Sequence, residues 1–202
     1  MPAQSHAAKL LRLAAKQPAV SARELSAQGI PARTVSRMAA RGQVRRVGRG
    51  LYTGTEGSPS AHQSVIELTK LAPKAVVCLL SALEIHGIGV QAPFEVWIAL
   101  PAGTHAPKGT QTSLRVTRLS GAAFTEGIET VVLDGARVRV YNLAKTITDC
   151  FKLRSKVGLD VALEALREAW QERKVTMDDL WRYAKFNRMT NVMRPYLESL
   201  TG

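Results

Sequence analysis

The sequence predicts an α+β protein. Three short helices and a basic hairpin occupy residues 1–54, and residues 61–202 form a mixed domain with a small, largely antiparallel sheet and several C-terminal helices. Apolar spacing, helix caps and an uneven charge distribution lead to this prediction. The 202 residues carry 28 Lys and Arg against 16 Asp and Glu, a net charge of +12, and the first fifty hold ten of the bases and one acid. This asymmetry indicates a polyanionic partner, either nucleic acid or an acidic membrane surface.

Two helices are expected at the start of the chain. Apolar residues at helical spacing predict the first over residues 6–16, and it ends before Pro18, which disfavours helical backbone in the residue ahead of it. Ser21 and Glu24 have the spacing of a capping box, which opens a short second helix over residues 22–27.

A third helix is expected from Pro31 to about Arg41, with Gly42 as its C-terminal stop. At about 100° per residue, one face of this helix is basic and hydroxyl-bearing, and the other is small and apolar. The basic face is predicted to carry Arg33, Thr34, Ser36, Arg37 and Arg41.

A short hairpin follows the third helix. Two β-prone pieces, residues 43–47 and 51–53, flank a Gly-Arg-Gly turn. The first strand carries Arg45 and Arg46, and the turn carries Arg49. This hairpin is therefore the second basic element of the first fifty residues.

Three short helices followed by a basic hairpin is the order of a winged helix-turn-helix. In such a domain the arginine face of the third helix enters the major groove, and the hairpin arginines hold the DNA backbone or the minor groove. Ser21 and Arg23 are expected to contact phosphate near the start of the second helix. The alternatives are solvated charged faces, a protein-docking module, RNA or a membrane; a membrane is disfavoured because no bulky aromatic residue stands opposite the arginines.

The remaining chain is expected to begin after a turn-rich linker at residues 55–60. A helix over residues 61–71 and a buried helix ending on Gly87 come first. Asp134-Gly135 predicts a tight hairpin turn. Strands are predicted over residues 95–100, 113–119, 128–133 and 137–141, and helices over residues 143–153, 159–170, 177–186 and 192–200.

Two sets of polar residues in this second part are candidates for a functional role. Lys145 and Asp149 are four residues apart, so an intrahelical ion pair accounts for them, with a polar site as the alternative. The sheet is expected to carry a solvated strand face or a second basic surface, formed by Arg115, Arg118, Arg137 and Arg139.

No catalytic residue, metal site or cofactor is predicted. The four histidines are scattered, no CxxC pair or phosphate-binding glycine loop occurs, and the acids on the strands lack the clustering of a metal-dependent nuclease. No apolar run approaches the length of about 18 residues that a membrane span needs, and no signal pattern begins the chain. Cys78 and Cys150 are expected as small buried hydrophobes, which fits a reducing cytoplasm.

The order of these motifs resembles the AbiEi family of antitoxins, from type IV abortive-infection toxin–antitoxin systems. The resemblance is carried by residues 31–42 and 44–52, by Leu80-Ser81-Ala82-Leu83 with His86-Gly87, and by residues 96–101, 139–141, 144–146 and 149–151. It implies a repressor that binds double-stranded DNA repeats upstream of its own operon. It also implies a C-terminal domain that antagonises a nucleotidyltransferase-like toxin without a stable complex. The alternative is a solitary winged-helix regulator whose C-terminal domain senses a ligand or contacts another protein.

Overall fold

The computed structural model describes residues 5–55, 62–89, 94–107 and 112–200. The chain divides into two compact units, each described by itself. The N-terminal unit comprises residues 1–75, 105–113 and 130–138, and the C-terminal unit comprises residues 76–104, 114–129 and 139–202. Most of the expected 55–60 linker lies outside the described residues.

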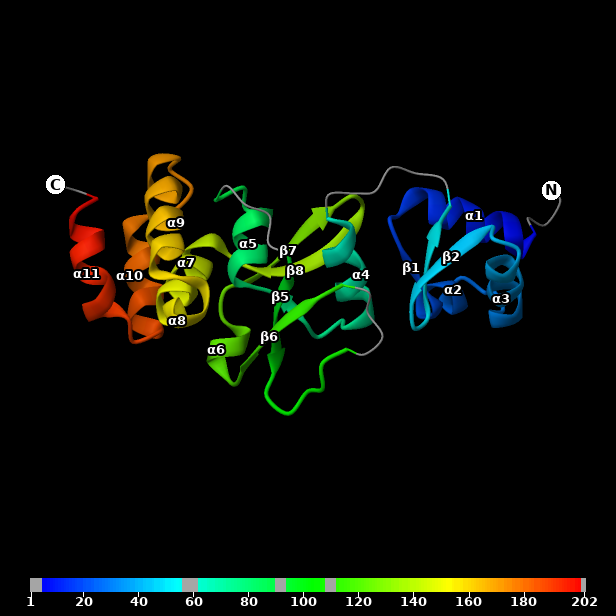
Figure 1. The fold of residues 1–202 in the computed structure, drawn as a ribbon, viewed down its shortest axis with the longest axis horizontal. Helices are drawn as coiled ribbons and strands as arrows, with labels where there is room; N and C mark the ends of the chain where they lie inside the picture. The colour runs from blue at the N-terminus through cyan, green and yellow to red at the C-terminus, as the bar shows by residue number, and fades with distance from the viewer. Residues whose placement is uncertain (1–4, 56–61, 90–93, 108–111, 201–202) are drawn as a thin grey trace. The chain divides into compact units, whose positions relative to one another are not determined.

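The N-terminal unit contains the three helices and the following hairpin that the sequence predicts (Figure 1). Its three strands pair antiparallel in the order β1-β3-β2. The two-residue strand β1 was not predicted, because two residues are too few to show a period. The elements are α1 (His6–Lys16), β1 (Val20–Ser21), α2 (Ala22–Ala27), α3 (Ala32–Ala40), β2 (Val44–Gly48), β3 (Leu51–Gly54) and α4 (Gln63–Leu71).

The three N-terminal helices close around one apolar core. Leu10 of α1, Leu25 of α2 and Met38 of α3 are almost completely buried in it. The predicted capping box is present: the Ser21 hydroxyl accepts from the Glu24 amide, and the Glu24 carboxylate accepts from the Ser21 amide. These contacts fix the angle between the first two helices and leave α3 with one face packed and one face exposed.

Helix α4 packs on the winged helix rather than standing apart from it. It contacts all three strands of the small sheet, and its Leu71 lies against a cluster of Val47 and Leu51. Gln63 at its start donates to the carbonyl of Pro18 at 3.1 Å. The sequence places this helix in the second domain, whereas its contacts place it in the N-terminal unit.

A five-stranded sheet has the strand order β6-β5-β4-β8-β7. The α+β class is confirmed, but this sheet is mixed rather than largely antiparallel. Strands β4 and β5 pair antiparallel, while β5 with β6 and β4 with β8 pair parallel. The short β4 was not predicted, because an apolar run does not distinguish a buried strand from a buried helix. The strands are β4 (Val76–Val77), β5 (Val96–Pro101), β6 (Leu114–Leu119), β7 (Ile128–Leu133) and β8 (Ala136–Tyr141).

The helices of the C-terminal unit surround α7, which contacts α5, α9 and α10. Nine of its ten residues are buried, so α7 is the central element of this core. The predicted helices all form. The buried helix expected before Gly87 covers only the second part of the long apolar segment. The helices are α5 (Leu79–Ile85), α6 (Ala122–Thr125), α7 (Leu143–Lys152), α8 (Arg154–Val157), α9 (Leu159–Gln171), α10 (Met177–Phe186) and α11 (Thr190–Glu198).

The expected Lys145–Asp149 ion pair forms, but inside the core rather than on the surface. Only 1% of the Lys145 side chain is exposed, its ammonium lies 2.5 Å from the Asp149 carboxylate, and it sits 3.9 Å from the centre of the Tyr141 ring. The amide of Asn187 donates to the second Asp149 oxygen at 2.7 Å. Each buried charge therefore has the partners that offset its desolvation.

The four arginines of the sheet do not form one surface. Arg115 is paired with Glu95 at 2.5 Å and lies over the Trp97 ring at 5.7 Å. Strand β6, which carries Arg115 and Arg118, is separated from β8 by β5 and β4. The interpretation as separate strand-face arginines is therefore favoured over a second basic surface.

Candidate nucleic-acid interface

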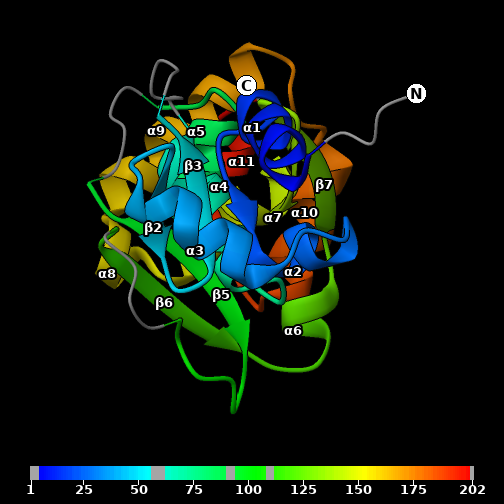
Figure 2. The same cartoon turned by 90° about the vertical axis from the view of Figure 1, so that its right-hand side faces the viewer.

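The exposed face of α3 is the centre of the candidate interface. Arg33, Ser36 and Arg37 are exposed there, while Val35 and Met38 are buried against the core. In Figure 2, α3 crosses the foreground of the N-terminal unit, and β2, which it contacts, runs beside it. The amphipathic pattern read from the sequence therefore positions two arginines, one helical turn apart, toward solvent.

Thr34 is not part of this face. Only 5% of it is exposed, so the prediction that it faces a groove is wrong. The helix is rotated slightly from the expected orientation: Thr34 lies about 40° from the buried Met38, and the core covers both. Ala32, at the opposite margin of the face, is exposed instead, and so is Ala40, which lies near the middle of the face. Nothing in the type of either residue signals function.

The C-terminal end of α3 leads directly into the hairpin. Arg41 is the C-cap residue and is exposed, and Gly42 follows with a φ of +69°, a conformation that glycine adopts without strain. Pro31 is the N-cap residue, one position earlier than the first-turn position expected for it. Pro31 thus marks the start of α3, and Gly42 marks its end.

The hairpin arginines are all exposed, as expected for a wing. Arg45, Arg46 and Arg49 stand between the buried residues Val44, Val47 and Leu51. The pairing register shifts between Arg46 and Gly48, and the Arg46 guanidinium donates to the Gly48 carbonyl at 3.2 Å. The adjacent residues Arg45 and Arg46 are thus both exposed just before an irregular point of the strand pairing.

The turn of the wing is held against the start of α2. The Ala22 amide donates to the Gly50 carbonyl at 2.6 Å. Gly50 has a φ of +70°, and a Cβ added there would lie 3.3 Å from the Ala22 Cβ. The wing is therefore positioned by the second helix as well as by its own strand pairing.

The start of α2 is already occupied by a carboxylate. The Ser21 hydroxyl donates to Glu24 at 2.8 Å while accepting from the Glu24 amide, and Lys70 lies 3.1 Å from the same carboxyl group. Burial raises the pKa of Glu24, but hydrogen bonds from Ser21 and Lys70 outweigh it, and the net pKa is below its ordinary value. Because a phosphate would meet this negative charge, the expected phosphate contact of Ser21 is not supported; Arg23 is exposed and stays a prediction.

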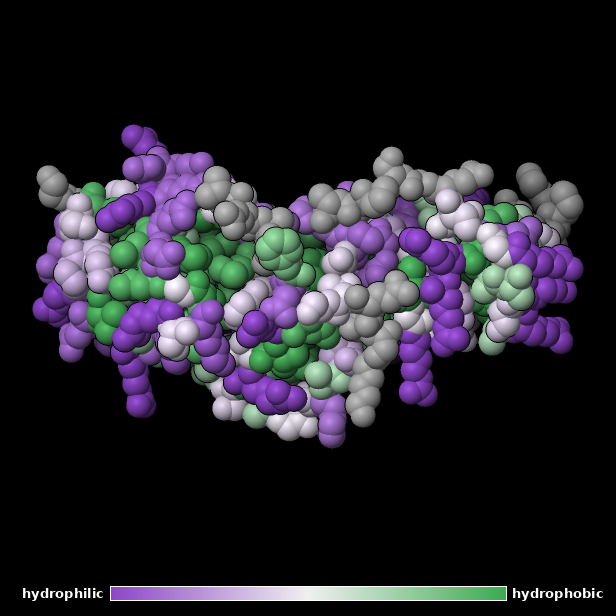
Figure 3. Space-filling model, in the orientation of Figure 1, coloured by the Kyte–Doolittle hydropathy of each residue, from purple (hydrophilic) through white to green (hydrophobic). Residues whose placement is uncertain are grey.

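The charge around α3 and the wing has one sign. The sequence contains no Asp or Glu from residue 25 to residue 55. In Figure 3, hydrophilic side chains project from the N-terminal unit around α3 and the hairpin. Arginines that share a helix and a hairpin without acidic residues of their own attract a polyanion over distances of about a Debye length, ~10 Å at 0.1 M salt.

Residues 8–53 match a protein-family model described as "Transcriptional regulator, AbiEi antitoxin". These are the residues from α1 to the last strand of the wing, so the resemblance stated from the sequence is confirmed over the N-terminal unit's basic elements. The match supports a DNA-binding regulator role in a toxin–antitoxin context.

A solved structure has the same fold over most of the chain. It is the crystal structure of the RV2827C protein from Mycobacterium tuberculosis, with a TM-score of 0.61, 16% sequence identity, and coverage of 89% of this chain and 71% of that chain. At this identity the likeness concerns the fold alone. No curated protein gave a significant match.

The described residues form neither a membrane-spanning helix nor a cluster of metal ligands. Within the described ranges, no helix is both long and apolar enough to cross a membrane. Among the same residues, no group of three or more His, Cys, Asp or Glu side chains could hold a metal ion.

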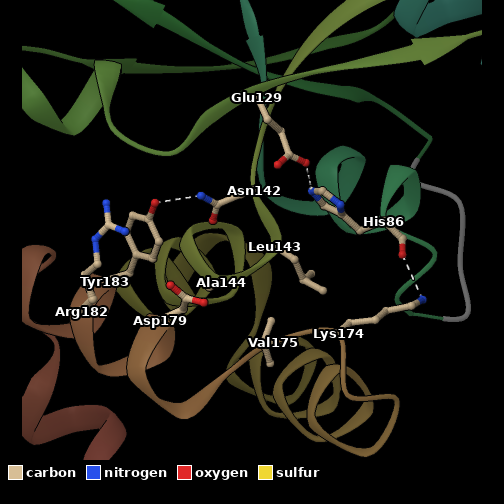
Figure 4. A pocket seen from close by; sticks show the side chains of 10 residues that line it. All are labelled: His86, Glu129, Asn142, Leu143, Ala144, Lys174, Val175, Asp179, Arg182 and Tyr183. Carbon is tan, nitrogen blue, oxygen red and sulfur yellow. Dashed lines mark hydrogen bonds and ion pairs between the residues drawn. The ribbon is translucent and has the colours of Figure 1, made fainter.

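The C-terminal unit contains a polar cavity of about 390 Å³ (Figure 4). Hydrogen bonds connect the segments around the cavity. The Asn142 amide donates to the Tyr183 hydroxyl at 2.8 Å, and Lys174 donates to the carbonyls of His86 and Gly87 at 3.1 and 3.0 Å. The lining combines charged groups of both signs with apolar side chains. The lining consists of His86, Glu129, Asn142, Leu143, Ala144, Lys174, Val175, Asp179, Arg182 and Tyr183.

Proposed function

We propose that the protein is a cytoplasmic transcriptional repressor that binds double-stranded DNA repeats in the promoter of its own operon. The observation that carries the proposal is the exposed arginine face of α3 beside an arginine-bearing wing, with no carboxylate in the sequence from residue 25 to 55. The family match over residues 8–53 supports the regulatory role. No catalytic step is proposed for this surface.

The arginines divide into two roles by their positions. Arg33 and Arg37 lie within the exposed face of α3, where a helix in the major groove presents side chains to base edges, and Ser36 lies beside them. Arg41 stands at the end of the helix, which suits a phosphate contact. Arg45, Arg46, Arg49 and Arg23 are assigned to the DNA backbone or the minor groove.

An electrophoretic shift of the chain's own promoter fragment tests this function. The Arg33→Ala/Arg37→Ala double variant should lose most of its affinity. The Arg167→Ala/Arg194→Ala variant removes the same charge from exposed positions of α9 and α11 and serves as the matched control. Equal affinity of both variants for the promoter fragment would show that α3 does not contact DNA. The affinity of the wild type should also fall steeply with salt, because neutralised phosphates release counterions.

We further propose that the C-terminal unit antagonises a nucleotidyltransferase-like toxin without forming a stable complex with it. The toxin–antitoxin description of the family supports this part. Co-expression with a nucleotidyltransferase-like protein encoded beside it should restore growth that the toxin alone arrests. Loss of rescue in an Arg33→Ala/Arg37→Ala background would show instead that protection works through repression.

The cavity of Figure 4 favours a second candidate function, a regulator whose C-terminal unit senses a small polar ligand. Its volume of about 390 Å³ lies in the range of small-molecule sites, about 300–1,000 Å³. Tyr183 is only 4% exposed, and its hydroxyl faces the cavity wall beside Asn142. A thermal-shift screen with free amino acids and nucleotides tests this candidate. A stabilisation that Tyr183→Phe abolishes would support it, and no shift with any compound would leave the repressor as the better account.

A further inference from the structure

The exposed face of α3 has a composition that restricts which bases it can recognise. Five residues of the helix are exposed, and they comprise two arginines and three small residues. None carries a side-chain amide or a carboxylate. They are Ala32, Arg33, Ser36, Arg37 and Ala40.

This composition matches one base better than the others. In the major groove, guanine offers two acceptors, O6 and N7, to the two parallel N–H groups of an arginine. Adenine is read by Asn or Gln and cytosine by Asp or Glu, and the exposed face of α3 has none of these four residue types. Arginine contacts to guanine are thus the strong direct contacts available to this helix.

The positions on the helix separate base contacts from phosphate contacts. At about 100° per residue, the exposed positions span about 180°, with Arg33 and Ala40 near the middle, Arg37 about 50° to one side and Arg41 at that margin. A side chain near the middle of the face points to the floor of the groove, whereas one at the margin points to its wall. Arg33 and Arg37 therefore suit bases, and Arg41 suits a phosphate.

The spacing of the two central arginines sets the spacing of their bases. Four residues advance a helix axis by about 6 Å, and neighbouring base pairs are about 3.4 Å apart, so the two side chains are about two base-pair steps apart along the groove. The neighbouring exposed side chains are small. Ser36 lies between the two arginines and Ala40 about one turn after Arg37, and neither would keep the helix away from the base edges. The methyl group of an alanine on this face also makes a favourable apolar contact with the methyl group of a thymine.

We infer that α3 of this protein reads a DNA site containing two guanines about two base pairs apart, contacted by Arg33 and Arg37, with a thymine beside Ala40. The inference rests on the proposed DNA-binding function and adds the operator's chemistry to it. Arg41 and the wing arginines contribute affinity without base preference.

Selection from a randomised double-stranded DNA library with the full chain tests this inference. The enriched motif should contain the two guanines, and Arg33→Ala and Arg37→Ala should each erase the preference at one of them while lowering affinity about tenfold. Arg41→Ala is the matched control: it should weaken binding to every sequence and leave the motif unchanged. A motif that lacks paired guanines, or that both base-reading variants keep, overturns the inference while DNA binding stands.

Chemically altered duplexes test the assignment without changing the protein. Replacing the selected guanines by 7-deazaguanine removes the N7 acceptor, and the wild type should lose about tenfold in affinity while Arg33→Ala loses affinity only at the Arg37 base. Replacing the thymine by deoxyuridine removes its methyl group and should weaken the wild type but not Ala40→Gly. Duplexes that bind equally well before and after the guanine change contradict the inference, and a chain that binds no duplex at low salt overturns the proposed function itself.

Discussion

The ammonium of Lys70 lies 3.1 Å from a carboxylate oxygen of Glu24, which forms the capping box of α2 with Ser21. The same ammonium donates to the side-chain oxygen of Gln17 at 2.6 Å and to the carbonyl of Ala19 at 2.5 Å. One side chain of α4 thus satisfies acceptors at the end of α1, in the connection after it and at the start of α2. Because α2 in turn holds the wing turn through Ala22, α4 supports the geometry of the candidate DNA-binding surface.

Lys70→Met should loosen the N-terminal unit. The lysine side chain is 12% exposed, and its replacement removes a donor from Gln17, Ala19 and Glu24, a loss of roughly 1–3 kcal/mol. Glu24 keeps its hydrogen bonds from Ser21. Hydrogen exchange should become faster in α2 and the wing. Lys185→Met, at an exposed position of α10, is the control and should leave exchange there unchanged. Wild-type exchange rates in Lys70→Met would show that α4 is not part of this unit.

Acid should weaken the same contacts. The pKa of Glu24 is below its ordinary value of 4.5, so the carboxylate contributes stability above that pH, and this contribution is lost as pH falls through the lowered pKa. The effect is modest because 44% of the side chain is exposed. Hydrogen exchange in α2 measured from pH 6 to pH 3 should show the loss, and Glu24→Gln should flatten this dependence. An identical pH profile in the variant would assign the acid sensitivity to other groups.

The buried pair of Lys145 and Asp149 should show strong coupling. Lys145→Met leaves the Asp149 charge in the core without its cation, and a broken buried pair costs about 3–5 kcal/mol. The Lys145→Met/Asp149→Leu double variant removes both charges and should lose less stability than the two single variants together. Chemical denaturation of the four proteins completes a double-mutant cycle. Additive losses would mean that the two side chains stabilise the core independently.

The two thiols should be inert in the folded protein. Cys78 and Cys150 are 2% and 0% exposed and free. Burial raises the pKa of both thiols, and the nearby Asp149 charge raises them further, so little thiolate forms at pH 8. A chromogenic disulfide reagent should react with them only after denaturant is added, at the rate of unfolding. Immediate reaction of two thiols in native buffer would contradict their burial.

The local elements of the N-terminal unit could be predicted because each has its own signal in the sequence. Ser21 and Glu24 mark the start of α2, Gly42 marks the end of α3, and the apolar spacing gives the buried face. The error at Thr34 shows the limit: a periodic pattern fixes a helix's faces only to within about one residue, and the packing of α1 and β2 sets the final rotation. Residues at the margin of a face are therefore the ones that sequence reasoning assigns wrongly.

Tertiary relationships had no comparable signal. Lys70 and Glu24 are 46 residues apart, and nothing in a lysine on a helix indicates that it will pair with a carboxylate of another helix. The cavity around Tyr183 combines side chains of β7, α7 and α10 with others from the connections between elements, each unremarkable on its own. Lys145 and Asp149 show the intermediate case: their spacing predicted the ion pair, and only the surrounding α5, α9 and α10 make it a buried one.

Gly127→Ala should disturb the C-terminal unit beyond the strain of its backbone conformation. Gly127 has a φ of +72°, and a Cβ there would lie 2.7 Å from a carbon of Lys145 and 3.0 Å from the Tyr183 hydroxyl. Gly103 has a similar φ of +78°, but a Cβ there would have no described atom within 4 Å. Both variants carry the cost of an alanine at positive φ, roughly 1–2 kcal/mol. Only Gly127→Ala also forces Lys145, Tyr183 and Asn142 to shift, so it should lose at least about 1 kcal/mol more in chemical denaturation. Equal losses in the two variants would mean that the core moves aside freely at Gly127, and that the hydrogen bond between Asn142 and Tyr183 is not held by close packing.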